Sequence, residues 1–298
     1  MSQFLLTLRK SINKVLVGAS KLFYNFDKKI NGVKKSKIYY TDKNTKENNI
    51  QVFYPVNYKE EKFPIIFYFH GGGWIEYDKI IYNTLCKRLA KMGNIVINID
   101  YTLAPKVKMY DLIGACIKTI EYALGFAQAN YNADSKVILA GDSAGAQISA
   151  LIGGLVSTCK LVELYPNSNL EHIDATLLFY GVYDFTTVEA TNFPSIELML
   201  NAVFDNKNKE REYKTFSPVN YVTSNFPPCF VASGEVDKLH NLQSVEFVNK
   251  LEKENAKYQK LFFAKDEKLA MHGFMALDDL KTNKETLKQV KNFLDNLN

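Results

Sequence analysis

Short apolar runs alternate with longer amphipathic stretches along most of the chain. Near-continuous apolar runs, rich in β-branched and aromatic side chains, occupy residues 64–69, 94–99, 137–140, 175–180, 229–233 and 258–264. Such runs are typical of strands that are buried on both faces of a sheet. Between them, apolar residues recur at helical spacing at residues 82–92, 108–128, 144–158, 242–254 and 279–297. The alternation predicts an α/β fold in which helices cover both faces of a mostly parallel central sheet.

Two shorter runs near the start of the chain have a different character. Residues 37–41 and 49–54 are β-type runs that are joined by the polar turn at 42–45. They predict an antiparallel pair at one edge of the sheet, which brings the sheet to about eight strands. Residues 185–217 interrupt the alternation later, because they are polar, aromatic and irregular with only short helical patches.

Length and composition fit one large α/β domain. The chain has 298 residues, of which 47% are hydrophobic, so there is enough apolar material for a core. No apolar run approaches the ~20 residues of a membrane span. The formal net charge of +5 is uneven, because residues 1–35 hold eight lysines and arginines against Asp27 alone. The remainder is close to neutral, which argues against nucleic-acid binding.

The cysteines lie in apolar or helical surroundings and form no C-x-x-C pair. They are Cys86, Cys116, Cys159 and Cys229. This pattern argues against a metal site. We interpret the four thiols as reduced core groups of an intracellular, cytoplasmic protein.

The clearest chemical motif is a serine between two glycines. The apolar run at residues 137–140 leads into Gly141-Asp142-Ser143-Ala144-Gly145, and a helical pattern follows. A strand, a sharp turn and a helix are the context in which Gly-x-Ser-x-Gly exposes a nucleophilic serine. The N-terminus of the following helix favours negative charge that develops there. The alternative interpretation is a Ser/Gly loop that caps an ordinary helix.

A serine nucleophile needs a base within hydrogen-bond reach and a group that orients the base. Asp237 follows the predicted strand at 229–233, and His272 follows the one at 258–264 after a short loop. The chain order Ser, Asp, His is that of α/β-hydrolases. We therefore expect His272 to take the proton of Ser143 and Asp237 to orient His272.

Other residues could fill these two roles. His70 belongs to a glycine motif and is better suited to holding its loop, while His172 lies in a polar connecting segment and His240 at the start of a helix. Glu235 is the rival of Asp237 as the acid. Asp237 itself has an alternative interpretation as a surface residue that caps the next helix.

A second glycine motif, His70-Gly71-Gly72-Gly73-Trp74, follows the predicted strand at 64–69. Glycine repeats where backbone N–H groups must point at a developing oxyanion, because no Cβ intervenes and unusual φ values are allowed. A phosphate-binding loop is the rival interpretation. It is weak, because no Lys-Ser/Thr pair follows and no G-x-G-x-x-G occurs.

Together, these motifs resemble those of the hormone-sensitive-lipase-like (family IV) carboxylesterases of the α/β-hydrolase superfamily. The resemblance is carried by residues 70–74, 141–145, 234–237 and 271–274, and it extends from about residue 50 to the C-terminus. Residues 100–105 also resemble the D-Y-R-L-A-P segment of that family, with threonine in place of the arginine.

The resemblance implies roles for particular residues. Gly71, Gly72 and Ala144 would donate their N–H groups to the oxyanion, and the acid would be Asp237. Lys238 stands where the family commonly has proline, and Asn241 where an acidic residue often follows, so the match around the acid is looser.

Aromatic residues near the motifs are candidates for the substrate pocket. Trp74, the only tryptophan, follows the glycine loop and is interpreted either as a wall of the acyl pocket or as a core residue. Tyr183 and Phe185 follow the strand at 175–180 and are further candidates for substrate binding.

The resemblance also implies a small helical cap over the active site of a single domain, 1–298. The cap elements would come from residues 1–35 and 185–217. Residues 1–24 show amphipathic helical periodicity with lysines between the apolar positions. Besides a cap role, this segment could contact an anionic membrane surface weakly through residues 1–30.

The expected function is hydrolysis of short- to medium-chain carboxylic esters through an acyl-enzyme intermediate, without metal or cofactor. The expected partner is a small-molecule ester, and a homodimer is one option for the assembly. An amidase or arylformamidase with the same triad, a membrane-acting lipase, and a catalytically silent ligand-binding protein are the alternatives. The last usually lacks the serine or the histidine, and both are present here.

Overall fold

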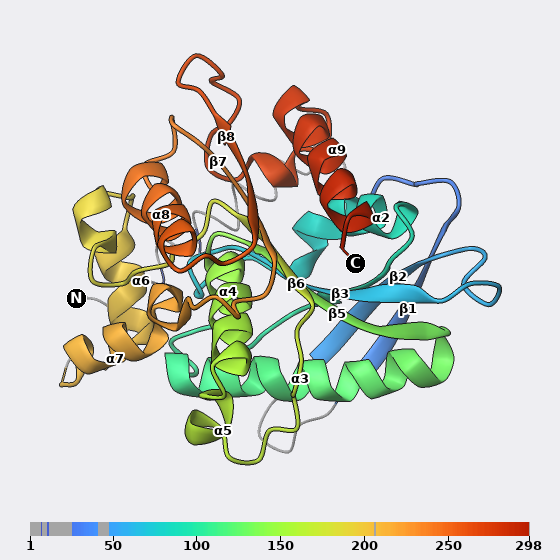
Figure 1. Cartoon of the computed structure of the whole chain (residues 1–298), viewed down its shortest axis with the longest axis horizontal. Helices are drawn as coiled ribbons and strands as arrows, with labels where there is room; N and C mark the ends of the chain where they lie inside the picture. Colours follow the sequence, from blue (N-terminus) through green and yellow to red (C-terminus); the bar gives the residue numbers. More distant parts are fainter. Residues whose placement is uncertain (1–6, 8–10, 12–25, 41–47, 206, 298) are drawn as a thin grey trace.

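The computed structural model describes residues 7, 11, 26–40, 48–205 and 207–297. In these residues the centre is an eight-stranded sheet with the strand order β1-β2-β4-β3-β5-β6-β7-β8 (Figure 1). The strands are β1 (Val33–Tyr40), β2 (Asn48–Pro55), β3 (Phe63–Phe69), β4 (Ile95–Ile99), β5 (Ala133–Asp142), β6 (Ala175–Phe179), β7 (Cys229–Gly234) and β8 (Tyr258–Phe263). The predicted α/β fold with its central sheet is confirmed.

The sheet is antiparallel at one edge and parallel elsewhere. β1 pairs with β2, and β2 with β4, in antiparallel fashion. All pairings from β4 to β8 are parallel. The predicted edge pair is therefore present, while its predicted turn at 42–45 lies outside the described residues. Because β3 to β8 run in one direction, the loops that follow them gather at a single edge of the sheet.

The helices occupy most of the sequence between the strands. The α-helices are α2 (Asn83–Lys91), α3 (Met109–Asn130), α4 (Ala144–Ser157), α5 (Leu161–Leu164), α6 (Ile196–Val203), α7 (Lys209–Phe216), α8 (Glu246–Lys253) and α9 (Lys281–Asp295). Tighter turns form η1 (Lys79–Tyr82), η2 (Val188–Thr191), η3 (Pro218–Tyr221) and η5 (Phe274–Ala276), and η4 (His240–Val245) is a π-helical turn.

Alternate residues of each strand pack against helices on opposite faces. In β3, Ile65 and Phe67 join the core beneath α3 and α4, whereas Ile66 and Tyr68 join the core beneath α2 and α9. All four side chains are buried. Figure 1 shows α2 and α9 together on one side of the sheet and α3 with α4 on the other. Burial on both faces explains why β3, with the sequence FPIIFYF, has no charged or amide side chain.

The insertion between β6 and β7 forms α6 and α7, in agreement with the predicted helical patches. Lys108, which precedes α3, fastens the end of α6, because its Nζ donates to the carbonyl oxygens of Ala202 and Phe204, both at 3.0 Å. The insertion therefore rests against the N-terminal end of α3.

The predicted amphipathic helix at residues 1–24 lies outside the described residues, apart from Thr7 and Ser11. Phe26 to Lys28 are described, and they lie along α2, where Thr84 N donates to Phe26 O at 2.9 Å. Residues 33–35 belong to β1. The part of the predicted cap at 26–35 is therefore wrong, because these residues extend the sheet and pack against α2.

Cys159 departs from the expectation of four core thiols. Cys86, Cys116 and Cys229 are buried, but Cys159 is exposed just beyond the end of α4.

Within the described ranges, no helix combines the length and the apolar character that a membrane crossing requires.

Candidate active site

Ser143 occupies a strained turn between β5 and α4. Its backbone has φ 50° and ψ −116°, a conformation that non-glycine residues rarely adopt. The turn is held because Ser143 N donates to Phe179 O of β6 at 2.9 Å. Strain of this kind is retained where the surroundings over-determine it, often at functional sites. The serine hydroxyl is thereby presented at the carboxyl edge of the sheet.

The two glycines of the motif allow close packing of the turn. A Cβ at Gly145 would lie 1.9 Å from Phe69 O, and one at Gly141 would lie 2.4 Å from the carbonyl carbon of Gly145. Both neighbours are backbone atoms, which cannot move aside as a flexible side chain can. A side chain at either position would therefore collide with the adjoining strand or helix.

The structure brings Ser143, His272 and Asp237 together in one hydrogen-bonded chain. His272 Nε2 lies 2.9 Å from Ser143 Oγ, and His272 Nδ1 lies 2.7 Å from Asp237 Oδ2. Asp237 is buried, and its other oxygen accepts from Leu239 N at 3.0 Å. A carboxylate at Nδ1 requires the proton on that nitrogen, which leaves Nε2 free to accept from the serine hydroxyl.

Aromatic side chains fix the imidazole ring in place. Phe193 and Tyr180 both approach the His272 ring edge to face, with centroid distances of 4.7 and 4.9 Å. The hydroxyl of Tyr180 also accepts from Met275 N at 3.2 Å, three residues beyond the histidine. The ring is therefore held both directly and through its own loop.

The rival histidines lie elsewhere. His172 pairs with Asp174 at 2.9 Å on the surface, and buried His240 contacts Ser233 Oγ at 2.7 Å. Burial lowers the pKa of His240. The hydrogen bond at His272 Nδ1 is formed with Asp237, not with the rival acid Glu235.

His70 holds the shape of the glycine loop, as the sequence favours. Its Nδ1 lies 2.6 Å from Gly71 O, and its ring stacks on Tyr101 at a centroid distance of 4.4 Å. Tyr101 OH in turn donates to His70 O at 2.7 Å.

Asp100 supports the same loop from behind. Its carboxylate lies 3.5 Å from His70 Nε2 and 2.6 Å from Lys79 Nζ. Burial alone would raise the pKa of Asp100, but His70 and Lys79 outweigh it and hold the pKa well below its usual range. The carboxylate is therefore a fixed negative charge beneath the loop.

Asp142, beside the nucleophile, anchors the start of the glycine loop. Its Oδ1 accepts from Gly71 N at 2.9 Å and from Tyr68 OH at 3.0 Å, and its Oδ2 accepts from Tyr82 OH at 2.5 Å. Burial raises the pKa of this carboxyl, and the hydrogen bonds from Tyr82 and Tyr68 oppose that rise. A side chain at Gly71 would lie 2.3 Å from Asp142 Oδ2, so glycine is required for the approach.

This anchor corrects the predicted set of oxyanion donors. The N–H of Gly71 points at Asp142, so it is not free to donate to a substrate. Gly72 and Gly73 follow with φ values of 122° and 55°, and both border the cavity at Ser143. Among the described residues, neither of their N–H groups nor that of Ala144 has an acceptor. The glycine N–H groups that are free at the cavity are therefore those of Gly72 and Gly73, one residue beyond the predicted pair, together with that of Ala144.

A cavity of about 100 Å³ opens beside the Ser143 hydroxyl. Its lining residues come from the glycine loop, the insertion between β6 and β7, and the segments that follow β5, β6, β7 and β8. They are Gly72, Gly73, Trp74, Glu76, Tyr77, Ser143, Val182, Phe193, Ile196, Met199, Leu239 and His272. Most of these side chains are apolar, so the cavity suits a small apolar group next to a reactive serine.

Of the three predicted pocket residues, only Trp74 borders this cavity. It is also a core residue, because its side chain is buried. Its Nε1 donates to Gln147 Oε1, which is buried as well, at 3.0 Å. Tyr183 is buried against Phe247 with stacked rings 4.2 Å apart, and Phe185 lies behind Trp74 at 5.4 Å. Neither reaches the cavity, so their predicted substrate contacts are wrong.

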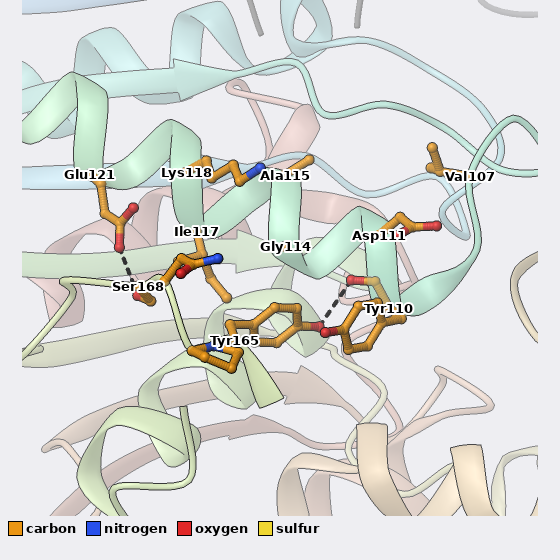
Figure 2. Close-up of a pocket in the computed structure, with 12 residues that line it drawn as sticks. Val107, Tyr110, Asp111, Gly114, Ala115, Ile117, Lys118, Glu121, Tyr165 and Ser168 are labelled. Atoms are coloured by element: carbon orange, nitrogen blue, oxygen red, sulfur yellow. Dashed lines mark hydrogen bonds between the residues drawn. The ribbon is translucent and has the colours of Figure 1, made fainter. Parts of the chain in front are cut away.

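A larger cavity of about 450 Å³ lies away from the triad, between α3 and the turn at 165–168 (Figure 2). It shares no lining residue with the cavity at Ser143. Tyr165 OH donates to Tyr110 O at 3.0 Å there, and Ser168 Oγ donates to Glu121 at 2.7 Å.

Within the described ranges, no group of three or more histidine, cysteine, aspartate or glutamate side chains could hold a metal ion.

Sequence reasoning missed the residues that support the site from outside the motifs. Tyr68 and Tyr82 hold Asp142, and Phe193, Ile196 and Met199 close the cavity from the cap. The sequence signal for Tyr68 is a hydroxyl group in a strand that is buried on both faces, because such a group needs a buried hydrogen-bond partner. The cap residues carry no such signal, because their positions depend on how the insertion folds back.

The eight-stranded, mostly parallel sheet with helices on both faces, and the strained turn that presents Ser143 between β5 and α4, are features of the α/β-hydrolase fold. Esterase B of Lactobacillus rhamnosis superimposes with a TM-score of 0.84 over 99% of this chain and 96% of that chain, at 19% identity. An esterase of Pseudomonas putida superimposes with a TM-score of 0.78 over 97% of this chain and 90% of that chain, also at 19% identity.

The BD-FAE family model matches residues 50–251, so the chain belongs to the BD-FAE family. Esterase LipC of Mycobacterium tuberculosis is 28% identical over 234 residues, which cover 74% of this chain and 55% of LipC. An acetyl esterase of Salmonella choleraesuis is 30% identical over 189 residues, 58% of this chain and 55% of that enzyme. The chain thus spans about half the length of the curated relatives it matches. The predicted kinship with α/β-hydrolase esterases is confirmed.

Proposed function

We propose that the protein is a serine carboxylesterase that hydrolyses esters of short acyl groups. The observation that carries the proposal is the unbroken hydrogen-bond chain from Ser143 through His272 to Asp237, beside a small apolar cavity. Relatives that are named esterases support the reaction class. The buried free thiols of Cys86, Cys116 and Cys229 are compatible with the predicted cytoplasmic location.

The proposed reaction has two halves. Ser143 Oγ attacks the ester carbonyl while His272 Nε2 takes its proton, and Asp237 stabilises the imidazolium that forms. His272 then returns the proton to the leaving alcohol, and a covalent acyl-enzyme remains. In the second half His272 takes a proton from water, the hydroxyl attacks the acyl carbon, and Ser143 leaves with the proton.

The negative oxygen of each tetrahedral intermediate would be held by the N–H groups of Gly72, Gly73 and Ala144. These groups need no rearrangement at the moment of reaction, because Asp142 and His70 already fix the loop. One such donor is typically worth about 3–4 kcal/mol of transition-state stabilisation.

The size of the cavity favours the short end of the predicted range of acyl chains. An apolar cavity of about 150 Å³ accommodates benzene. A cavity of about 100 Å³ therefore suits an acyl group of roughly two to four carbons. Longer chains would have to displace Ile196 or Met199, both of which are buried.

The test is hydrolysis of p-nitrophenyl esters from acetate to dodecanoate by the wild-type chain and by Ser143→Ala. We expect activity to peak at the short esters, and Ser143→Ala to lower kcat by about 10⁴–10⁶-fold. Hydrolysis that does not depend on Ser143 would contradict the proposal. Serine-dependent cleavage of anilides and formanilides without ester cleavage would make the protein an amidase instead.

A further inference from the structure

The loop that carries His272 is long and irregular, yet it must hold the imidazole to a few tenths of an ångström. It extends from the end of β8 to the start of α9, with only the short η5 turn inside it. Ordering such a segment is entropically unfavourable unless specific contacts fix it. The contacts that fix this loop should therefore govern the geometry of the base.

One set of contacts holds the loop from the side of the sheet and α9. Met275 N donates to Tyr180 OH at 3.2 Å, and Asn283 Nδ2 donates to Met275 O at 2.9 Å. Thr282 Oγ1 donates to Leu269 O at 3.1 Å, on the other side of the histidine. These bonds leave one flank of the loop, residues 277–280, to be fixed by other means.

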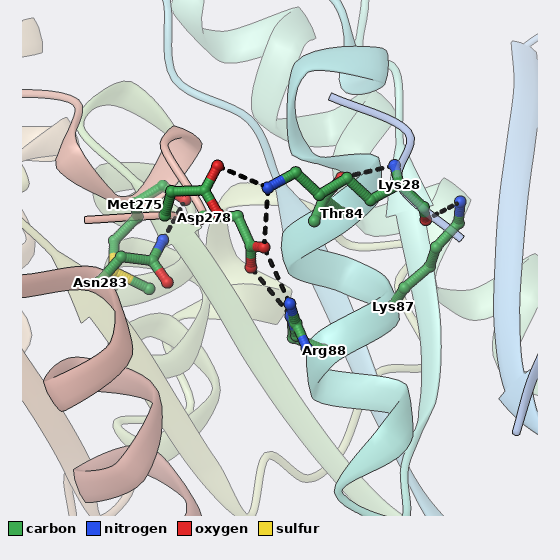
Figure 3. A network of polar contacts seen from close by, with 8 residues as sticks. Lys28, Thr84, Lys87, Arg88, Met275, Asp278 and Asn283 are labelled. Atoms are coloured by element: carbon green, nitrogen blue, oxygen red, sulfur yellow. Dashed lines mark hydrogen bonds and ion pairs between the residues drawn. The ribbon is translucent and has the colours of Figure 1, made fainter. Parts of the chain in front are cut away.

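The two leucines of that flank, Leu277 and Leu280, pack against the core beneath α2 and α9. The two aspartates between them are held by an ion cluster. Arg88 donates two parallel hydrogen bonds to Asp278, from Nε and a terminal nitrogen, both at 2.9 Å (Figure 3). The Asp278 side chain is only 8% exposed, whereas that of Arg88 is 41% exposed. The guanidinium of Arg88 holds the pKa of Asp278 below its usual value. A two-pronged bond of this kind fixes orientation as well as distance.

Lys28 joins the same cluster from the chain segment that precedes β1. Its Nζ lies 2.7 Å from Asp279 and 3.4 Å from Asp278. Its backbone is bound to α2, because Lys28 N donates to Thr84 Oγ1 at 3.0 Å and Lys87 Nζ donates to Lys28 O at 2.8 Å. Figure 3 shows the side chains of Arg88 and Lys28 directed at Asp278 from the two segments.

The segment that leads into α2 also contacts the glycine loop. Tyr82, one residue before α2, donates to Asp142, which holds the glycine loop through Gly71 N. Arg88 of α2 extends to the loop of the base. The continuous segment of η1 and α2 is thus bonded both to the glycine loop, through Asp142, and to the histidine loop.

We propose that Arg88 and Asp278 are positioning residues that set His272 against Ser143, with Lys28 completing the clamp. The inference rests on the proposed function, because it takes His272 as the base. Without Arg88, the Asp278 carboxylate turns toward solvent and carries residues 277–280 with it. The imidazole then loses its alignment, and misplacement of a catalytic group by about 1 Å can lower the rate 10²-fold.

The experiment compares the full-length chain with Arg88→Met, Arg88→Lys and the control Lys160→Met. Lys160 forms an exposed ion pair with Glu163, so its replacement makes the same change of charge away from the His272 loop. The readouts are kcat and KM for p-nitrophenyl acetate, and the low-field proton resonance of a histidine Nδ1–H that donates to a carboxylate. The His272→Gln variant assigns that resonance. All measurements are made well below the melting temperature.

We expect Arg88→Met to lower kcat by about 10–100-fold with KM changed by less than about threefold. The resonance should shift or broaden. Arg88→Lys keeps the positive charge but not the paired hydrogen bonds of the guanidinium. Its kcat should therefore lie between those of the wild type and Arg88→Met. Lys160→Met should match the wild type in both readouts.

Folded Arg88→Met with wild-type kcat and an unchanged resonance would overturn the proposal, as would an equal loss in Lys160→Met. Should Arg88→Met not fold, Arg88→Lys decides: an unchanged kcat and resonance would refute the clamp. The resonance also separates this inference from the proposed function. A wild type without serine-dependent hydrolysis would refute the esterase, while the shift of the resonance in the Arg88 variants would still support the clamp.

Discussion

At the scale of single residues, Asp142 links the nucleophile to the oxyanion loop. Its carboxylate is buried and accepts three hydrogen bonds, from Tyr68, Tyr82 and the Gly71 amide. Burying a carboxylate is favourable only when its oxygens are satisfied. The two tyrosines therefore stabilise the loop geometry, although neither touches the reacting atoms.

We expect Tyr82→Phe to lower both stability and activity. It removes the donor to Asp142 Oδ2, and an unsatisfied buried acceptor costs about 1–3 kcal/mol. The loosened carboxylate should also let Gly71 move, so kcat should fall several-fold. Urea unfolding and ester hydrolysis measure the two effects. The matched control is Tyr58→Phe, a half-buried tyrosine away from Asp142, which should stay within about 0.5 kcal/mol of the wild type. Equal stability of Tyr82→Phe and wild type would contradict this role of Asp142.

Met199 is expected to limit the length of the acyl chain. Its sulfur lies next to Gly73, where a Cβ would approach it to 2.4 Å, and the side chain borders the cavity at Ser143. Met199→Ala should raise kcat/KM for octanoate relative to acetate. The control is Leu198→Ala, the neighbouring α6 residue that does not border the cavity. A chain-length profile that moves equally in both variants, or in neither, would rule out Met199 as the limit.

The sequence predicts the hydrogen-bonded triad better than its surroundings. Ser143, Asp237 and His272 are recognisable because each follows a strand whose apolar run is unmistakable. Which glycine N–H groups are free to donate to an oxyanion depends on which of them is bonded to Asp142. A run of three glycines does not reveal which one that is. Tyr183 and Phe185 were wrongly placed in the pocket, because distance from the strand end does not tell which way a loop turns.

At the scale of elements, the strands and most helices follow the sequence pattern closely. The exception is the helix predicted at 242–254, which begins as the π-helical turn η4 before α8. Gln243 in that turn accepts from Tyr183 N and Asp184 N, at 2.7 and 2.9 Å. Its amide therefore satisfies the backbone of the loop after β6, a long-range requirement that helical periodicity does not report.

The junction between α2 and the histidine loop should make stability depend on pH. Because Arg88 lowers the pKa of Asp278 in the folded state, the pair contributes stability above the unfolded pKa of about 4. That contribution disappears as the pH falls through the lowered folded value. Asp278→Asn should therefore be less stable than wild type at pH 7, and the difference should shrink below about pH 4. Urea unfolding at several pH values measures it, and a difference that stays constant down to acid pH would contradict the ion pair's contribution.

At the scale of the whole molecule, the parallel order of β3 to β8 places the three triad residues at one edge of the sheet. Such a layout follows from short βα connections and could be predicted from the alternation of runs alone. The insertion between β6 and β7 could not, because its helices are short and its packing depends on long-range contacts, both apolar ones with the core beneath α3 and the hydrogen bonds of Lys108. The prediction for residues 1–24, cap or membrane contact, concerns a part of the chain outside the described residues.

The most direct measurement of the central claim is titration of the wild-type chain with a p-nitrophenyl alkylphosphonate, which mimics the tetrahedral intermediate. We expect release of one equivalent of p-nitrophenol, a phosphonyl group on Ser143 located by mass spectrometry, and loss of ester hydrolysis in proportion to the modification. His272→Gln should react far more slowly. Ester hydrolysis that persists after Ser143 is fully modified would contradict the account.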